Sequence, residues 1–566
     1  MIRTSLSDSI PSPVVEPGAA AGSLVSRWIA DHPNAIALLI FCAWMLPGLI
    51  GRDLWKPDEG YTFGLVNHIL RTGDWVIPTL TGEPFMEKPP VFYLVAALFA
   101  NITSTVLPLH DGARLACALF VGLAALFMAR SSSVMLPHRP VWVAPLLLIG
   151  SLGLTIHAHQ LITDNALLCG FAIAIYGFAL ALRRPLAGGF WLGTGTGLGF
   201  MAKGLLAPGI IGMAALVLPA CYAPWRTRRY LVVLCIAFLT AAPWLSIWPV
   251  ALYLRSPQLF LDWFWTNNFG RFFGFVHLGP PAEPYAYPKL LLWFALPSLP
   301  LALRALWVRR EELRTDAGLQ IATTVFAVMF AVLSASANAR ELYAMPMLIP
   351  LALLGVWGLE NLPPFVTQYL HWLSALLFTA LALAVWACWC AVDLGFPTRL
   401  SALLQQKQPL YASHVRLGLL SIAIVLSVGW LMLISNRPGP YRPVMTWAAG
   451  VATVWGLLGI LMVNWFDTGM SYRGMLSELA QSLPAGHACI ESRNLGESQR
   501  AIFEYFSDIV TDRQENPSAR KDCGLLLMQT LEQASAPSPG EPWTVIWDGS
   551  RPGDYHEHFW LYRKMP

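Results

Sequence analysis

Long apolar runs recur along most of this sequence, and they constrain its fold more than any other feature. A helix that crosses a bilayer needs about 20 consecutive apolar residues. About thirteen runs reach this length or come close to it: 36–51, 112–129, 141–158, 165–182, 189–202, 205–222, 230–250, 289–307, 319–337, 342–359, 370–392, 415–435 and 444–464. Inside lipid the backbone polar groups must bond to one another, so such runs fold as helices. The sequence therefore predicts an α-helical polytopic membrane protein.

The composition agrees with this class. The 566 residues are 56% hydrophobic and only 12% charged, whereas soluble domains carry roughly 25% charged residues. The chain also holds 24 Trp and 16 Tyr, residue types that gather at membrane–water interfaces. Its net charge of +4 is small and dispersed, which argues against a nucleic-acid partner.

The two ends of the chain differ from its apolar middle. Residues 1–30 are mostly polar and rich in Pro, Ala and Ser, and we predict that they form a disordered cytoplasmic tail. The first apolar run lacks a clear signal-peptide cleavage site and is interpreted as a retained anchor. Residues 31–465 then form the transmembrane domain, and residues 466–566 a small soluble α/β domain. Its helix-like stretches are 472–483 and 498–507, and its strand-like stretches are 524–528 and 543–547.

Basic residues predict which side of the membrane each loop faces. The apolar stretch 91–107 either crosses the bilayer or lies on its surface, and only a surface helix makes the charge pattern consistent. One face then collects Arg130, His138, Arg139, Arg183, Arg184, Arg226, Arg228, Arg229, Arg309, Arg310, Arg314, Arg437 and Arg442. Lys and Arg concentrate in short cytoplasmic loops, so this face is predicted to be the cytoplasmic one. The periplasmic face then holds the first loop, 52–111, with its surface helices, and everything after about residue 465.

Two of the nine cysteines lie in the polar C-terminal part of the chain. The other seven lie in or beside apolar runs and are explained as small packing residues. Cys489 and Cys523 would be able to pair if their compartment is oxidising. The sequence leaves the disulfide open, because spacing alone does not fix the geometry.

The first periplasmic loop is dense in ionisable groups. Asp58 and Glu59 are adjacent, and Glu87 and Lys88 precede two prolines that fix the backbone. Of two neighbouring carboxylates, one can take a proton from an attacking hydroxyl while the other orients it. The alternative is an ordinary acidic helix start that satisfies free backbone N–H groups.

Asp164 stands between two apolar runs, shortly after His157 and His159. An ionised group at that depth is costly, so it either lines a wet cavity or pairs with a cation. It can also cap the helix that begins at Asn165. A metal site made by the two histidines and Asp164 is a further interpretation that the sequence leaves open.

Four cations lie on the predicted periplasmic face, against the usual charge bias: Lys88, Lys203, Arg271 and Arg340. Together they suit a phosphate or pyrophosphate group. Singly, each is also explained as a side chain that anchors a helix end at the interface. The sequence has no P-loop and no dinucleotide-binding glycine motif. A phosphorylated substrate on this face is therefore better explained as a lipid carrier than as a cytosolic nucleotide.

Several of these segments together resemble a known enzyme family. They are Asp58-Glu59, the run Gly73-Asp74-Trp75-Val76-Ile77-Pro78, the run Gly82-Glu83-Pro84-Phe85-Met86-Glu87-Lys88-Pro89-Pro90, Asp164, Met201-Ala202-Lys203-Gly204, the segment 268–277 and the segment 340–346. In this order they resemble the bacterial transferases of the lipid A aminoarabinose transferase and protein O-mannosyltransferase superfamily. The resemblance covers roughly residues 35–360, and the later part matches in layout only.

The resemblance implies a GT-C fold and an inverting transfer of a sugar from a polyprenyl phosphate, such as undecaprenyl phosphate, to lipid A, another glycan, a protein or a lipid of the cell envelope. It also implies a bacterial inner-membrane location with the site facing the periplasm. The residues that it assigns fall into groups. The catalytic candidates are Asp58, Glu59 and Asp164; the candidates for binding the donor phosphate are Lys88, Lys203, Arg271, Arg340 and Tyr343; and the other substrate-binding candidates are Tyr61 and His277.

Two features depart from the family pattern or leave it incomplete. Glu87 matches a position that contributes to a divalent metal in the aminoarabinose branch, but its partner histidines have no counterpart that we can place. The first acidic pair usually reads Asp-Glu-x-Arg-Tyr, whereas this chain has Gly60, Tyr61 and Thr62 after Glu59. The missing Arg removes a group expected near the donor, so the resemblance does not name the sugar.

Two rival functions remain open at this level. A transporter or flippase of lipid-linked sugars also has many spans and intramembrane charges. A non-catalytic assembly factor would use the C-terminal domain to bind a partner. The clustering of charge at helix ends on one face favours an enzyme.

Overall fold

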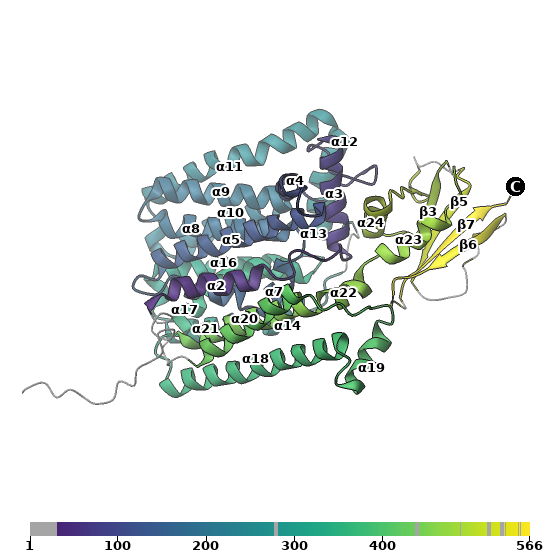
Figure 1. Cartoon of the computed structure of the whole chain (residues 1–566). Coiled ribbons are helices and arrows are strands. Elements are labelled where there is room, and N and C mark those ends of the chain that lie inside the picture. Colours follow the sequence, from purple (N-terminus) through teal and green to yellow (C-terminus); the bar gives the residue numbers. More distant parts are fainter. Residues whose placement is uncertain are drawn as a thin grey trace, which may run out of the picture.

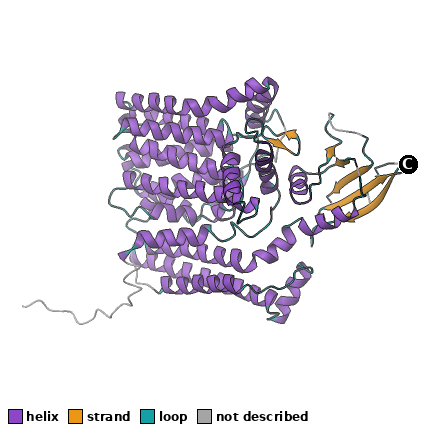
Figure 2. Cartoon of the chain, turned by 45° about the horizontal axis from the view of Figure 1, so that its top comes forward, coloured by secondary structure: helices purple, strands orange, loops and turns teal. Residues whose placement is uncertain are grey.

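The computed structural model describes residues 31–276, 281–435, 441–486, 488–517, 522–531, 537, 539–540, 542–552, 554 and 556–565. The predicted tail, residues 1–30, falls outside this part of the chain, and so does His277. Figure 1 shows a bundle of long, nearly parallel helices with a small sheet beyond one of its ends. Figure 2 shows that the strands are confined almost entirely to that end.

Each of the thirteen apolar runs lies largely in helix. The helices that contain them are α2 (Pro33–Met45), α5 (Leu109–Met135), α6 (Val143–Ile149), α7 (Leu152–Ala158), α8 (Asp164–Ala181), α9 (Pro185–Lys203), α10 (Leu206–Cys221), α11 (Arg228–Arg255), α14 (Ala286–Phe294), α15 (Ser298–Val308), α16 (Ala317–Ser334), η4 (Glu341–Met347), α17 (Leu348–Gly358), α18 (Pro364–Asp393), α20 (Leu417–Ile434), α21 (Arg442–Leu457), η5 (Leu458–Met462) and α22 (Val463–Met470).

Fewer of these helices could cross a bilayer alone than the count of runs suggests. In the described part of the chain, eight helices are long and apolar enough by themselves, and nine if α14 and α15, bent by 102°, form one span. The run 141–158 is divided between α6 and α7, and α2 and α10 are short apolar helices. Breaks and short helices are tolerated at membrane depth where neighbouring helices cover the freed backbone groups.

Several short elements lie at the end of the bundle that carries the sheet (Figure 1). Helix α3 (Asp58–Thr72) lies across this end, and α4 (Val91–Thr103) packs against α3 and α5. Like α2, α4 has 13 residues and is short for a span, so the surface position of α4 stays a prediction. The other elements here are the hairpin β1 (Thr79–Leu80) and β2 (Glu83–Pro84), with α12 (Pro257–Leu261), η2 (Asp262–Gly270), α13 (Arg271–Phe273) and α19 (Thr398–Lys407).

The opposite end of the bundle holds basic loops that contact one another. Glu360 forms ion pairs with Arg139 and Arg309, which come from two different loops. Short connections complete this part, at η1 (Ala223–Trp225) and η3 (Glu312–Arg314). The structure thus brings together loops that the charge pattern assigns to one face.

A mixed five-stranded sheet follows the last long helix. The strand order is β4 (Asp512–Arg513), β3 (Ile490–Arg493), β5 (Leu525–Thr530), β7 (His558–Lys564) and β6 (Trp543–Gly549). β3 runs parallel to β4 and β5, and β7 runs antiparallel to β5 and β6. Helices α23 (Arg473–Ser482) and α24 (Glu497–Ser507) confirm the two predicted helical stretches, as β5 and β6 confirm the strands. Cys489 and Cys523 form a disulfide.

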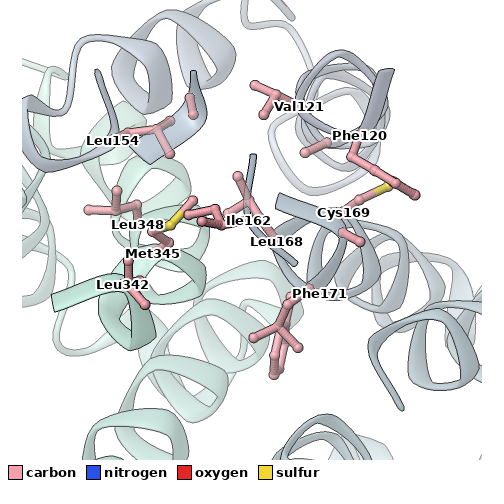
Figure 3. Close-up of a cluster of buried hydrophobic side chains, with 14 of the residues drawn as sticks. Phe120, Val121, Leu154, Ile162, Leu168, Cys169, Phe171, Leu342, Met345 and Leu348 are labelled. Carbon is pink, nitrogen blue, oxygen red and sulfur yellow. The ribbon is translucent and has the colours of Figure 1, made fainter. Parts of the chain in front are cut away.

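The buried core supports the end of the bundle where α3 lies. Figure 3 shows side chains of α5, α8, η4 and α17 meeting in one apolar cluster, together with Leu154 and Ile162. Ile162 lies two residues before Asp164, and Leu342 lies two residues after Arg340; both are at most 5% exposed. The core therefore fixes the backbone that carries these two charged residues.

Candidate active site

Helix α3 begins at Asp58 and presents three different faces to its surroundings. Asp58 and Tyr61, three residues apart, lie on one face, since residues three and four apart in a helix are neighbours. Glu59 lies on a second face, and Gly60 and Gly64 on a third. Each face contacts a different part of the protein, so the helix brings three sets of contacts to one place.

The first face forms a chain of polar contacts. The Tyr61 hydroxyl donates to Asp58 Oδ1 at 2.7 Å, and Lys88 Nζ donates to the Tyr61 oxygen at 3.1 Å. Nη2 of Arg340 lies 3.1 and 2.9 Å from the two Asp58 oxygens. Burial raises the pKa of Tyr61 to about 12. Although burial opposes it, the charge of Asp58 raises the pKa of Arg340.

Tyr61 thus stands where the family pattern has an Arg, and it joins Asp58 to Lys88. Arg340 brings a guanidinium to the same carboxylate from a distant segment of the chain. Although the Arg of the family pattern is absent, positive charge therefore still lies beside Asp58.

The second face holds Glu59 in a buried ion-pair network. Arg52 lies 2.5 Å and Arg114 3.1 Å from its carboxylate. The backbone N–H groups of Trp55 and Leu161 donate to the same carboxylate, each at 3.1 Å. Burial raises the pKa of Glu59, but the two guanidinium charges outweigh it and hold the pKa well below the usual range. The Glu59 carboxylate is therefore fully engaged by groups of the protein itself. This geometry gives Glu59 an anchoring role rather than a place at the substrate.

Asp164 and Lys203 form a second ion pair near the first. Asp164, at the start of α8, is 1% exposed, and its Oδ1 accepts a hydrogen bond from Lys203 Nζ at the end of α9. The Lys203 ammonium also lies 4.0 Å from the centre of the Tyr343 ring. Asp164 therefore pairs with a cation, which is one of the alternatives that the sequence left open.

A groove of about 330 Å³ runs past these residues; we call it the donor groove. Its charged side chains are Lys88, Lys203, Arg271 and Glu87. The rest of its wall is largely apolar, with Leu205, Leu206, Ile210, Met213, Phe269, Phe272, Phe273, Val332 and Leu333. Cations at one place and apolar surface beside them fit a phosphate that carries a hydrocarbon chain.

Neither of the metal sites considered from the sequence finds a ligand set. Glu87 forms an ion pair with Arg271 at 3.4 Å. Within the described residues, the only three His, Cys or acidic groups whose ligand atoms all lie within 4.8 Å of one another are elsewhere, at the disulfide. His159 bonds to the backbone carbonyls of Thr155 and Trp44. The residues present therefore do not fit a divalent metal at Glu87, and we derive no step through one.

The structure brings most of the predicted residues together. Contacts or a shared groove join Asp58, Tyr61, Lys88, Asp164, Lys203, Arg271, Arg340 and Tyr343. Glu59 contacts Arg52 and Arg114 instead, and Glu87 lines the donor groove with Lys88 and Lys203. Arg52 and Arg114, the partners of Glu59, were not among the predicted site residues. Arg52 stood in the charged loop, but Arg114 lies inside an apolar run where a single charge signals burial.

The third face of α3 packs against α24 of the C-terminal part. A Cβ atom added at Gly60 would lie 2.1 Å from the Ser498 hydroxyl, and one added at Gly64 would lie 2.5 Å from Leu80 Cδ1 and 2.7 Å from the Ala501 Cβ. Polar contacts surround this interface: Glu83 bonds to Arg500 and Asn516. Further ion pairs join Lys56 to Glu557, Asp53 to Arg473 and Arg71 to Asp508. The C-terminal part thus holds the helix that carries Asp58.

We expect Gly64→Ala to destabilise the protein by about 1–3 kcal/mol, because the added methyl overpacks a close contact. Thermal unfolding in detergent measures the change. The double variant with Ala501→Gly should be more stable than the sum of the two single changes predicts, since the second change removes one of the two clashing atoms and leaves only Leu80 Cδ1, the end of a flexible side chain. Gly429→Ala is the matched control, as its Cβ would meet nothing within 4 Å. Strict additivity of the two changes would contradict the interpretation of this contact.

Comparison with known proteins finds relatives along most of the chain. No protein-family model matches. An undecaprenyl phosphate-α-4-amino-4-deoxy-L-arabinose arabinosyl transferase of Pseudomonas fluorescens is 26% identical over 466 residues, which cover 78% of this chain and 73% of the relative. The enzyme of the same name from Pseudomonas savastanoi pv. phaseolicola is 28% identical over 452 residues, covering 76% and 77%.

Solved structures show the same architecture. The crystal structure of ArnT from Cupriavidus metallidurans bound to undecaprenyl phosphate superposes with a TM-score of 0.67 at 16% identity, covering 95% of this chain and 98% of that one. Its apo form gives the same TM-score at 17% identity. The expected fold and the expected resemblance are thereby confirmed. The chain is a polytopic membrane protein of the GT-C glycosyltransferase fold, related in sequence and structure to the undecaprenyl phosphate aminoarabinose transferases.

Proposed function

We propose that this protein is an inverting glycosyltransferase that moves a sugar from undecaprenyl phosphate to an acceptor of the cell envelope such as lipid A. The donor groove is the observation that carries this proposal. It combines the cations Lys88, Lys203 and Arg271 with an apolar wall. A polyprenyl phosphate is complementary to both, with an anionic phosphate and a hydrocarbon chain, whereas a soluble sugar nucleotide has no hydrocarbon chain.

The cations and the carboxylates at the donor groove have different roles. Lys88, Lys203 and Arg271 bind the donor phosphate and stabilise the charge that grows on it as it leaves. Asp164 holds Lys203 in place from behind. Asp58 acts on the acceptor: it takes the proton of an attacking hydroxyl, or it positions an acceptor phosphate, which is already ionised. Attack on the anomeric carbon from the side opposite the phosphate inverts the sugar.

The orientation follows from charge. The loops with most Lys and Arg lie at the end of the bundle away from α3, and cytoplasmic loops are the ones enriched in these residues. The site therefore faces the periplasm of a bacterial inner membrane. A lipid carrier that receives its sugar in the cytoplasm and is then flipped across the membrane supplies the sugar on this side without a soluble nucleotide.

Transfer of a labelled sugar by purified protein in detergent tests the proposal. Donor and acceptor are both present in micelles, and label appearing on the acceptor supports an enzyme. A flippase or transporter needs a sealed compartment and leaves the label on undecaprenyl phosphate. Absence of transfer from every donor and acceptor tried, with lipid movement in sealed vesicles, would contradict the proposal.

Lys88→Gln should weaken binding of undecaprenyl phosphate by about 10- to 100-fold, because a charge-assisted hydrogen bond contributes about 1.5–3 kcal/mol. Titration of the purified protein with the lipid measures this. Lys407→Gln, at an exposed position on α19, is the matched control and should bind the lipid as the unchanged protein does. Equal affinities for all three proteins would remove Lys88 from the phosphate site.

A further inference from the structure

A cavity of about 890 Å³ opens at the end of the bundle that carries the basic loops, away from α3. Its wall comes mainly from the N-terminal parts of α18 and α21, the loop before α18 and the loop after α5. The charged and aromatic side chains of this wall are Arg139, Glu360, Arg442, His371, Trp372 and Tyr441, and we call the space between them the basic cavity. The proposed sugar transfer makes no use of it, because the donor groove lies at the other end of the bundle (Figure 1).

Two helix N-termini meet at the basic cavity. α18 begins at Pro364 and α21 at Arg442, and both of these residues line the cavity. Neither helix has a side chain that caps its first N–H groups. The N-terminus of a helix carries a partial positive charge and binds anions. The backbone alone therefore favours a negatively charged group in this place.

The side chains of the wall add positive charge. Arg442 Nη2 donates to the Ile434 carbonyl at 2.7 Å, and the described residues give Arg442 no ion pair. Most of the five N–H donors of its guanidinium are thus left for a ligand. Glu360, the only carboxylate among the described residues that line the cavity, is already paired with Arg139 and Arg309. The wall can therefore bind a phosphate through charge-assisted hydrogen bonds.

A buried histidine in the wall is an independent sign of a polar ligand. His371 lines the basic cavity and is 3% exposed. Its Nδ1 shares a hydrogen bond of 2.8 Å with the Thr446 hydroxyl, whereas its buried Nε2 makes no hydrogen bond of ordinary geometry with the described residues. Leaving such an atom unbonded costs free energy. Nε2 can bond to a phosphate oxygen in one tautomer and to a hydroxyl group in the other.

The side of α18 next to the cavity is apolar and exposed. Trp372 lines the cavity and is 51% exposed, and Phe365 and Tyr369, at helical spacing from it, are 73% and 64% exposed. α18 is long and apolar enough to cross a bilayer, so these aromatic side chains lie at the depth of the lipid head groups. Leu376 and Leu383 are exposed farther along the helix. A hydrocarbon chain can therefore leave the cavity along α18.

We propose that the basic cavity binds an anionic glycerophospholipid. Its phosphate lies between Arg442 and the N-terminus of α18, a hydroxyl or phosphate oxygen of its head group reaches His371 Nε2, and its acyl chains follow α18 past Trp372. Basic pockets between spans on the cytoplasmic side of a membrane bind lipids of this kind. The inference goes beyond the proposed function, and only the name of the leaflet, the cytoplasmic one, rests on the orientation proposed above.

Native mass spectrometry of the full-length protein in mild detergent, titrated with phosphatidylglycerol, tests the cavity. We expect the unchanged protein to bind this lipid about 10-fold more tightly than phosphatidylcholine with the same acyl chains, which has a phosphate but no net charge. Arg442→Gln should weaken phosphatidylglycerol binding by about 10- to 100-fold. Gln368→Glu should weaken it by about 5-fold, because it adds a negative charge to the wall.

The second variant and two controls separate binding from folding. Gln368 is exposed near the start of α18, where a carboxylate does not oppose helix formation. The matched controls are Arg229→Gln, at the exposed start of α11 on the same predicted face, and Gln406→Glu, at an exposed position on α19. Both controls should bind phosphatidylglycerol as the unchanged protein does. Thermal unfolding in detergent checks that every variant is folded.

Unchanged affinity for phosphatidylglycerol in both Arg442→Gln and Gln368→Glu would overturn the basic cavity as the lipid site. Equal binding of phosphatidylcholine would overturn net negative charge as the recognised feature. Glycerophosphoglycerol, the same head group without acyl chains, should not displace the lipid at about 100-fold excess, since it lacks the apolar contacts along α18. Displacement would identify a site for a soluble phosphate and would overturn the lipid as the ligand. None of these outcomes depends on sugar transfer.

Discussion

Asp58→Asn should lower the rate of sugar transfer by about 10²- to 10⁴-fold while the protein still folds and inserts. Asn keeps the shape of the side chain and can still accept from Tyr61, but it has no charge to hold Arg340. Whether Asp58 takes a proton or fixes Arg340 against an acceptor phosphate, the neutral amide fails at the step that transfers the sugar. The measurement is the initial rate with saturating donor, with thermal unfolding in detergent as the check of folding.

Asp74→Asn is the matched control for Asp58→Asn. Asp74 lies in the same loop region and pairs with Arg255, a residue of which half the side chain is exposed. Exposed ion pairs contribute little to stability, and Asp74 does not line the donor groove. Its variant should therefore transfer sugar at close to the normal rate. Normal turnover by Asp58→Asn would exclude Asp58 from the reaction.

Glu59→Gln should act on stability instead, with a loss of about 3–5 kcal/mol, because breaking a buried ion pair leaves buried charge uncompensated, and only Arg114 keeps another carboxylate, Asp111. Here the partners are Arg52 and Arg114, whose side chains are 4% and 0% exposed. Thermal unfolding in detergent measures the loss, and Glu478→Gln, at an exposed position on α23, is the control. A Glu59→Gln protein of normal stability that had lost only its activity would contradict the anchoring role.

The effect of pH on this network has a definite sign. The pKa of Glu59 in the folded protein is depressed, because Arg114 and Arg52 outweigh the cost of burial. Its contribution to stability is therefore complete above the unfolded pKa of about 4.3 and is lost as the pH falls from there toward the folded value. Stability attributable to Glu59 should consequently be constant from neutral pH down to about 5.

The class of fold followed from the sequence because lipid leaves few choices for an apolar run. The surface position of 91–107 followed from the charge pattern, since only that assignment placed the basic loops on one side. It stays a prediction, because α4 has the same length as α2. The division of the run 141–158 into α6 and α7 was not predictable, because the break at Gly150 and Ser151 depends on packing. Trp447 and the α14 region meet that break from distant parts of the chain.

The residues of the candidate site were predictable where a charged side chain occurred next to an apolar run, in which charge is not expected. Asp164 and Lys203 were singled out because each lay at a helix boundary next to apolar surface, and they proved to be partners. The different roles of Asp58 and Glu59 were not predictable from their adjacent positions in the sequence. They depend on which side of α3 each residue faces and on Arg340 and Arg114, which lie far away in the sequence.

The contact between α3 and α24 was also beyond the sequence analysis. Gly60 and Gly64 have the spacing of a helix face that another helix can approach closely. Nothing in the sequence said that the approaching helix would come from the C-terminal part, more than 400 residues away, as the Arg500–Glu83 bond of 417 residues' separation shows. Strands β3 and β7 were missed because short or mixed-polarity strands carry a weak periodic signal.

A structure of the protein with undecaprenyl phosphate bound, determined by electron cryo-microscopy, tests the central claim most directly. We predict that the phosphate oxygens lie within hydrogen-bond distance, about 3 Å, of Nζ of both Lys88 and Lys203, with the first part of the prenyl chain along the apolar wall of the donor groove. A phosphate bound outside this groove, with both lysines still engaged only with Tyr61 and Asp164, would contradict the account.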